Sequence, residues 1–177
     1  MLFAVILWNF IMFPLCRIWP GLETTLMLRF PAEVSTPLLA LLVSMMRAFT
    51  YTFIHSGALH LCANMLWLLI FGYSLYPRIG TLRFFSLYFG GGLAGAVTFA
   101  LLFSLCPEPR ASLCGASAAG LAITGASIFL TPRRGLAAIA TLLTFAASPS
   151  LPSIATHAGG LLTGLAAGLL WKSRASA

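Results

Sequence analysis

The sequence predicts an all-α membrane protein, a bundle of six transmembrane helices that forms a single domain over residues 1–177. The first observation is composition: 60% of the 177 residues are hydrophobic and only 7% are charged, with a mean hydropathy of +0.99. A soluble domain of this length cannot bury so many apolar side chains. The second observation is that prolines, glycines and arginines divide the chain into apolar runs of helical length. We expect helices over about 2–19, 57–76, 82–105, 115–131, 135–147 and 153–171.

The first predicted helix is an apolar run interrupted only by Asn9, Pro14 and Arg17. The run lacks the basic start and small-residue cleavage site of a signal peptide, so we interpret it as a transmembrane helix. The following stretch, about 20–56, is expected to be a loop. Its second part, Thr36 to Ser56, is apolar but contains a proline, an arginine and a histidine. We interpret this part as a membrane-surface segment rather than a span.

The second and third helices are bounded by prolines. Pro77 and Arg78 end the second helix near Tyr76, and the third helix carries a glycine-rich face at 90–95 that is suited to close helix packing. A segment with two prolines, 106–110, ends the third helix.

The last three helices are separated by short connections. The fourth helix has about 17 residues and spans ~25 Å at ~1.5 Å per residue, which is less than the ~30 Å hydrocarbon core. Its outer end is therefore expected below the outer membrane surface. The residues before it, 110–114, would dip inward, which is tolerated where they line a wet cavity. The fifth helix is shorter and rich in alanine, so we expect most of its contacts to come from Leu142, Leu143 and Phe145.

The charge distribution orients the bundle. An even number of spans places both termini on one side, and that side carries six basic residues and no acid: Arg78, Arg83, Arg133, Arg134, Lys172 and Arg174. The other side mixes four arginines with the three glutamates of the chain. The positive-inside rule then predicts cytoplasmic termini. The formal charge of +7 is scattered singly or in pairs between apolar runs, which argues against nucleic-acid binding.

Four polar residues within the apolar runs are the candidate functional residues, because polar side chains are costly inside a bilayer. Ser117 lies in the small-residue run 115–120, and His157 begins the apolar part of the last helix. Both helices start on the outer side, so the two residues are expected to meet at similar depth. Neutral histidine can take the serine proton. The chain has no aspartate, and its glutamates lie in loops, so this pair would act as a Ser–His dyad. The remaining two, His60 and Asn64, share one helix face at i, i+4.

No metal or other cofactor is expected. Three histidines without a carboxylate partner, two of them at i, i+5, do not form a zinc site on one helix face. The four cysteines form no Cys-x-x-Cys motif and are interpreted as small hydrophobic residues, although a bond between Cys106 and Cys114 stays open.

At these residues the chain resembles the rhomboid family of intramembrane serine proteases. The resemblance runs from about Arg47 to the end of the chain, in the order of the family. Its motifs are Arg47-x-x-Thr50, His55-x4-His60-x3-Asn64, Gly115-x-Ser117 and His157-x-x-Gly160-x-x-x-Gly164. As a set these motifs are highly specific.

The resemblance implies a role for each matching residue. Ser117 would be the nucleophile and His157 the general base and acid. The side chains of His60 and Asn64, with the Ser117 amide, would form the oxyanion hole. Three glycines would support the site through close packing: Gly115, Gly160 and Gly164.

The resemblance also implies partners and a location. Substrates would be transmembrane segments of other proteins, reached sideways from the lipid bilayer past the fifth helix. We expect a multi-pass protein of a bacterial cytoplasmic (inner) membrane; the sequence indicates no oligomeric state. Two departures from the family pattern stand out: Tyr76 replaces a glutamate often found at the end of the second helix, and Leu121 replaces an aromatic residue that stacks on the histidine in some members.

Three alternatives stay open. A rhomboid-like protein that binds membrane clients without cutting them usually lacks the serine or histidine, and both are present here. A specialist that processes one C-terminal sorting tail would carry the same motifs. A small transporter would require paired charges and inverted repeats, neither of which is evident.

Overall fold

The computed structural model describes residues 2–29, 36–106, 112–148 and 150–175, and it is almost entirely helical. The all-α prediction is confirmed. In chain order the elements are α1 (Leu2–Ile18), α2 (Leu22–Leu26), β1 (Leu28–Arg29), α3 (Pro37–Thr50), η1 (Tyr51–Phe53), α4 (Ala58–Trp67), η2 (Leu68–Gly72), α5 (Tyr73–Leu105), β2 (Ser112–Leu113), α6 (Ser117–Leu130), α7 (Arg134–Ala146) and α8 (Leu151–Ala175). The predicted loop residues 30–35 and 107–111 lie outside the described residues.

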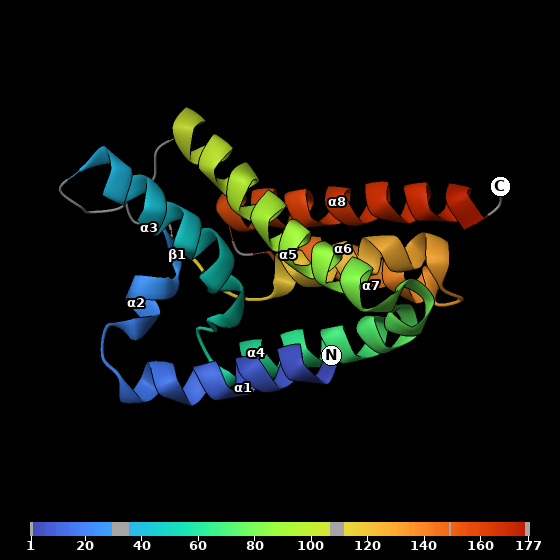
Figure 1. Ribbon diagram of the computed structural model, residues 1–177, viewed down its shortest axis with the longest axis horizontal. Helices are drawn as coiled ribbons and strands as arrows, with labels where there is room; N and C mark the ends of the chain where they lie inside the picture. The colour runs from blue at the N-terminus through green and yellow to red at the C-terminus, as the bar shows by residue number, and fades with distance from the viewer. Residues whose placement is uncertain (1, 30–35, 107–111, 149, 176–177) are drawn as a thin grey trace.

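The chain reverses direction after the predicted end of the second helix. We expected the break at Pro77 and Arg78, but helical geometry continues through Pro77, and the backbone leaves it at Gly80, with φ 75° and ψ 176°. A positive φ is readily adopted by glycine, which has no Cβ. The turn therefore lies within α5, and Figure 1 shows the chain reversing direction there, at the right-hand end of the molecule. The prediction of the boundary was therefore three residues too early.

Two segments are long and apolar enough to cross a membrane. They are Ala58–Leu105, which includes the turn at Gly80, and Leu151–Arg174. The other apolar helices are shorter, at 10–17 residues: Leu2–Ile18, Pro37–Phe53, Ser117–Leu130 and Arg134–Ala146. The count of six spans is thus still a prediction.

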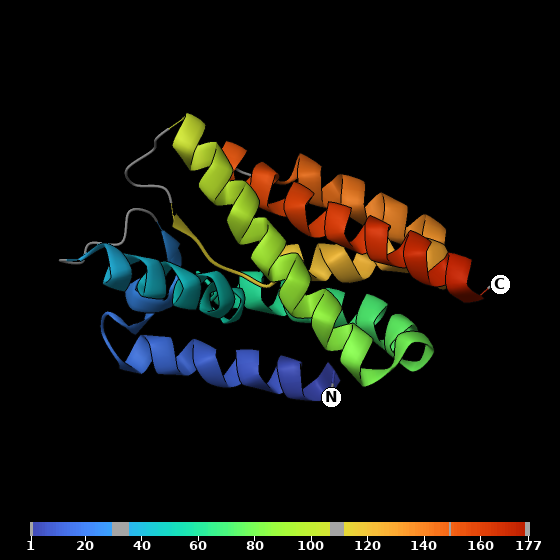
Figure 2. The ribbon, with the colours of Figure 1, turned by 45° about the horizontal axis from the view of Figure 1, so that its top comes forward.

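Helix α6 forms the centre of the bundle. Its residues from Ala118 to Ser127 are all buried, and it packs against α5, α7 and α8. Figures 1 and 2 show α8 running alongside α6 in the same direction. A Cβ atom at Gly160 or Gly164 of α8 would overlap the backbone carbonyl of Ala118 or Ala122, respectively. The absence of side chains at these glycines therefore lets the two helices approach closely.

Helix α7 packs on α6 through small residues. Its buried residues are Ala137, Ala140 and Thr141. Leu142 and Leu143 are 70% and 62% exposed. The expectation that these leucines supply most of the contacts of this helix was therefore wrong, because the α-helical period turns them away from α6.

The segment between α1 and α4 is stabilised by hydrogen bonds to other parts of the chain. Strands β1 and β2 pair antiparallel, with Leu28 opposite Leu113. Arg47 Nε donates to the carbonyl of Thr25 (3.1 Å), and Thr50 Oγ1 donates to the carbonyl of Leu26 (2.7 Å). Helix α3 thus holds α2 and β1 in place, while its outward face carries exposed leucines. Its location at the membrane surface stays a prediction.

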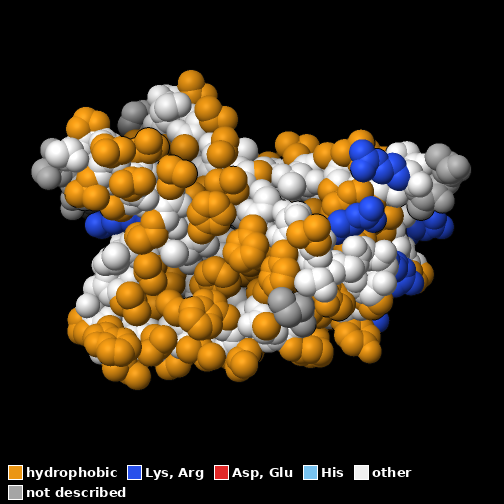
Figure 3. Space-filling view, viewed as in Figure 1, with side chains coloured by type: hydrophobic (Ala, Val, Ile, Leu, Met, Phe, Trp, Pro, Cys, Tyr) orange, Lys and Arg blue, Asp and Glu red, His pale blue; other side chains and the backbone are white. Residues whose placement is uncertain are grey.

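The basic residues predicted for one side of the membrane are exposed. All six of them, Arg78, Arg83, Arg133, Arg134, Lys172 and Arg174, have exposed side chains. Figure 3 shows that most of the Lys and Arg side chains visible on this face gather at the end where α8 terminates, while apolar side chains cover much of the rest.

Candidate active site

Ser117 is the first residue of α6, and the backbone before it is fixed by two features. Gly115 has φ +116°, a conformation that other residues rarely adopt, and its N–H donates to the carbonyl of Tyr51 (3.0 Å). The first N–H groups of a helix have no partner within that helix. The Ser117 amide is therefore a backbone donor at the positive end of the helix dipole.

The structure brings Ser117 and His157 together, although they lie forty residues apart in the sequence. The Nε2 atom of His157 on α8 lies 2.8 Å from the Oγ atom of Ser117. Both side chains line a cavity of about 450 Å³. This is hydrogen-bond distance, which a serine requires if a histidine is to take its proton.

The other ring nitrogen of His157 also has a partner. Its Nδ1 atom lies 2.9 Å from the Oγ atom of Ser148, which follows α7 and donates to the carbonyl of Thr144 at 2.8 Å. The ring of Phe145 meets the His157 ring edge-on, with centroids 6.1 Å apart. Neither neighbour was predicted from the sequence. Leu121 was the one position predicted for a ring that stacks on the histidine, whereas the ring comes from Phe145 of α7.

His60 and Asn64 of α4 face the same cavity. A Cβ atom at Gly115 would lie 2.7 Å from His60 Nε2 and 3.3 Å from Asn64 Nδ2, so both groups lie close to the backbone that leads to Ser117. Asn64 Nδ2 is buried and has no hydrogen-bond partner among the described residues. An unpaired buried donor is costly, and an acceptor that entered the cavity would remove that cost.

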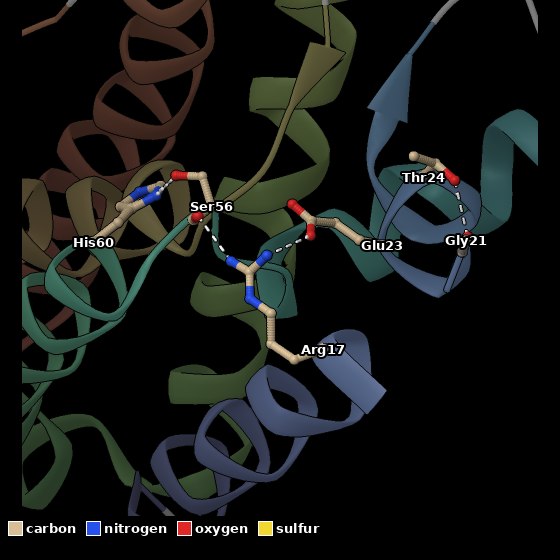
Figure 4. A network of polar contacts seen from close by, with 6 residues as sticks. All are labelled: Arg17, Gly21, Glu23, Thr24, Ser56 and His60. Carbon is tan, nitrogen blue, oxygen red and sulfur yellow. Dashed lines mark hydrogen bonds and ion pairs between the residues drawn. The ribbon is translucent and has the colours of Figure 1, made fainter. Parts of the chain in front are cut away.

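A polar network holds the beginning of α4 (Figure 4). Ser56 Oγ lies 3.1 Å from His60 Nδ1, and the carbonyl of Ser56 accepts from Arg17 Nη2 at 2.8 Å. The Nη1 atom of Arg17 also lies 3.3 Å from a carboxylate oxygen of Glu23. The end of α1 is thereby linked to His60. This contact of Arg17 was not predicted from the sequence, in which Arg17 only interrupts an apolar run and adds a charge on the side opposite the termini.

His55 packs against His60. It is buried, with 2% exposure, and its ring packs edge-on against the His60 ring with centroids 5.1 Å apart. Burial, together with the neighbouring His60, lowers the pKa of His55 to about 4. His55 is therefore neutral at physiological pH. Within the described ranges, no three His, Cys, Asp or Glu side chains are grouped to hold a metal ion.

The helical bundle and the Ser–His pair define a class: an α-helical membrane protein with a cavity among its helices that a serine and a histidine line. The model of the Rhomboid domain matches residues 43–174, so the chain belongs to the rhomboid family. A comparison with curated proteins found no match. Rhomboid proteins are integral membrane proteins and are typically serine intramembrane proteases that act on transmembrane substrates, although some members do not cleave.

Proposed function

We propose that this protein is an intramembrane serine endopeptidase that cleaves transmembrane or membrane-edge segments of other proteins. The observation that carries the proposal is the 2.8 Å distance between His157 Nε2 and Ser117 Oγ at a cavity. A non-cleaving member would have no need for this pair, because binding a client requires neither a nucleophile nor a base.

In the proposed reaction, His157 takes the proton of Ser117 as the hydroxyl attacks the scissile carbonyl. The developing oxyanion would accept hydrogen bonds from the Ser117 amide, from Asn64 Nδ2 and from His60. His157 then gives its proton to the leaving amine, and water hydrolyses the acyl-enzyme. The unpaired Asn64 donor supports this arrangement, since preorganised donors stabilise the transition state most when they are not otherwise engaged.

The depth of the site suits a membrane substrate. Helix α6 has 14 residues, so it spans ~21 Å, which is less than the ~30 Å hydrocarbon core. Ser117 at its outer end would then lie below the outer membrane surface. The cavity would admit the water that hydrolysis requires.

The test is cleavage of a model transmembrane substrate by the purified protein in detergent or liposomes. Ser117→Ala and His157→Ala should each abolish cleavage, and the double variant should be no worse, because the pair acts as a unit. Ser127→Ala is the matched control, since Ser127 is a buried serine of the same helix whose hydroxyl donates to the Ile123 carbonyl. A fluorophosphonate probe should label Ser117 alone. Substantial cleavage by Ser117→Ala would disprove the serine mechanism.

A further inference from the structure

The hydrogen-bond geometry at Ser148 defines which ring nitrogen of His157 carries a proton. The Oγ atom of Ser148 lies 2.8 Å from the carbonyl oxygen of Thr144 and 2.9 Å from His157 Nδ1. A carbonyl oxygen can only accept a hydrogen bond, and a serine hydroxyl has one proton to donate. The Ser148 proton therefore lies toward Thr144, and Ser148 offers a lone pair to the histidine.

The protonation of His157 follows from this arrangement. A lone pair on Ser148 Oγ requires a hydrogen on Nδ1. In a neutral imidazole the other nitrogen is then an acceptor. That nitrogen, Nε2, is the atom 2.8 Å from Ser117 Oγ. In the opposite tautomer His157 Nδ1 would be an acceptor, so the single proton of Ser148 would face two acceptors, Nδ1 and the Thr144 carbonyl. Nε2 of His157 would then carry a hydrogen and could not take a proton from Ser117.

We propose that Ser148 is a positioning residue that holds His157 in the Nδ1–H tautomer, with Nε2 free to act as the base. The inference rests on the proposed protease function and deepens it. Ser148 occupies the place that an acidic side chain takes in a three-residue site. It is uncharged and accepts from Nδ1–H through an oxygen whose own proton is engaged by Thr144. When His157 becomes an imidazolium, the same chain of hydrogen bonds stabilises its charge.

The support for the histidine comes from the outer end of α7. The Ser148 N–H donates to the Phe145 carbonyl at 3.2 Å, and the Thr144 hydroxyl donates to the Ala140 carbonyl at 3.0 Å. Phe145 adds its ring edge against the imidazole. Phe145 of α7 thus contacts His157 through its ring, and Ser148, two residues after the end of α7, contacts it through its hydroxyl. A displacement of this end of α7 would remove the Nδ1 acceptor and deprive Ser117 of its base.

The first experiment measures the tautomer directly. Protein labelled with ¹⁵N-histidine, purified in detergent micelles at about pH 8, where an ordinary histidine is neutral, should give ¹⁵N signals for a His157 protonated at Nδ1. The chain has three histidines, and the His157→Gln variant identifies the His157 signals. In Ser148→Ala the spectrum should change to a tautomer mixture or to Nε2–H. Ser148→Thr keeps the hydroxyl and should keep the wild-type tautomer.

The second experiment separates positioning from folding. Ser148→Ala should lower kcat by about 10- to 100-fold, the usual effect of losing a hydrogen bond to a charged group, and leave KM unchanged. Ser148→Thr should restore most of kcat. The matched control is Thr141→Ala, because the Thr141 hydroxyl makes the same kind of bond within α7, to the Ala137 carbonyl at 2.9 Å, without touching His157. It should keep wild-type kcat.

The outcomes are distinguishable from a failure of the proposed function. If the wild-type protein neither cleaves nor takes up the fluorophosphonate, the protease proposal fails, while the spectrum still decides the role of Ser148. An Nε2–H tautomer in the wild type would overturn the inference, as would an unchanged tautomer in Ser148→Ala. If Ser148→Ala does not fold, Ser148→Cys, a weaker acceptor of similar shape, replaces it in both measurements.

Discussion

At the scale of single residues, the candidate site is assembled from polar side chains that the surrounding helices leave partly unsatisfied. Asn64 has a buried amide nitrogen without a partner in the described part of the chain. Ser117 has an amide at the open end of a helix. Such groups lower stability in the resting protein. They are the groups that a developing oxyanion would use.

Asn64 provides the first prediction. Asn64→Ala should lower kcat by ~10²–10³, the typical cost of losing one oxyanion donor. It should not lower the thermal stability, because no bond of Asn64 Nδ2 within the described residues is lost. Substrate turnover in detergent tests the predicted loss of kcat, and a thermal melt tests the predicted stability. The fluorophosphonate probe should still label Ser117. Cleavage at the wild-type rate would make Asn64 a packing residue only.

His55 provides a prediction about pH. Its pKa is about 4 in the folded protein, against 6.5 when unperturbed, because it is buried beside His60. Between these two values the unfolded chain binds the extra proton, so stability should fall as the pH drops from about 6.5 to about 4. The full effect is of the order of 3 kcal/mol. Melting temperatures from pH 7.5 to about 4.5 should therefore decline less steeply for His55→Gln than for the wild type. Parallel declines would show that His55 is not the titrating group.

At the scale of elements, the sequence predicted features that lie within one helix, but it did not predict contacts that depend on how two helices pack. The polar residues of the site were predictable because a serine, an asparagine and two histidines stand out within apolar runs. Ser148 was not predictable, since it is an ordinary serine between two helices until α7 and α8 are placed. The same holds for Phe145. Its contact with His157 depends on how α7 packs, and a residue pattern within one helix does not encode this.

Helix α1 contacts the candidate site through Arg17, and this gives a prediction at the scale of elements. Arg17 Nη2 donates a hydrogen bond to the carbonyl of Ser56 (Figure 4). The hydroxyl of the same serine lies within hydrogen-bond distance of His60 Nδ1. Arg17→Gln should lower kcat by about 2- to 10-fold, the worth of one ordinary hydrogen bond. Glu23→Gln is the matched control. It removes the exposed ion pair, which contributes little, but leaves the bond to Ser56. Equal losses in both variants would assign the effect to the ion pair instead.

At the scale of the whole molecule, charged side chains are distributed unevenly along the bundle. Six exposed basic residues belong to the turn at Gly80, the α6–α7 connection and the end of α8. Glu23, the acidic residue that the structure describes, lies near the opposite end, where α1 terminates and the cavity begins. Because the positive-inside rule counts basic residues close to membrane segments, it predicts that the basic end lies in the cytoplasm and that the cavity faces the outside.

This orientation is the last prediction, and two cysteine positions test it. Cys106 is exposed at the C-terminal end of α5, and Ser173 is exposed near the end of α8. Two single-cysteine proteins would carry Cys106 alone or Ser173→Cys alone, with the other cysteines replaced by alanine, and a cysteine-free protein would be the blank. In intact cells an impermeant maleimide should label Cys106, and it should label Ser173→Cys only after permeabilisation. The reverse pattern would turn the cavity toward the cytoplasm, and cleavage products could then not be released outside the cell. The expected pattern, combined with loss of cleavage in Ser117→Ala, would place peptide-bond hydrolysis at the outer half of the membrane, where a short α6 leaves room for water above Ser117.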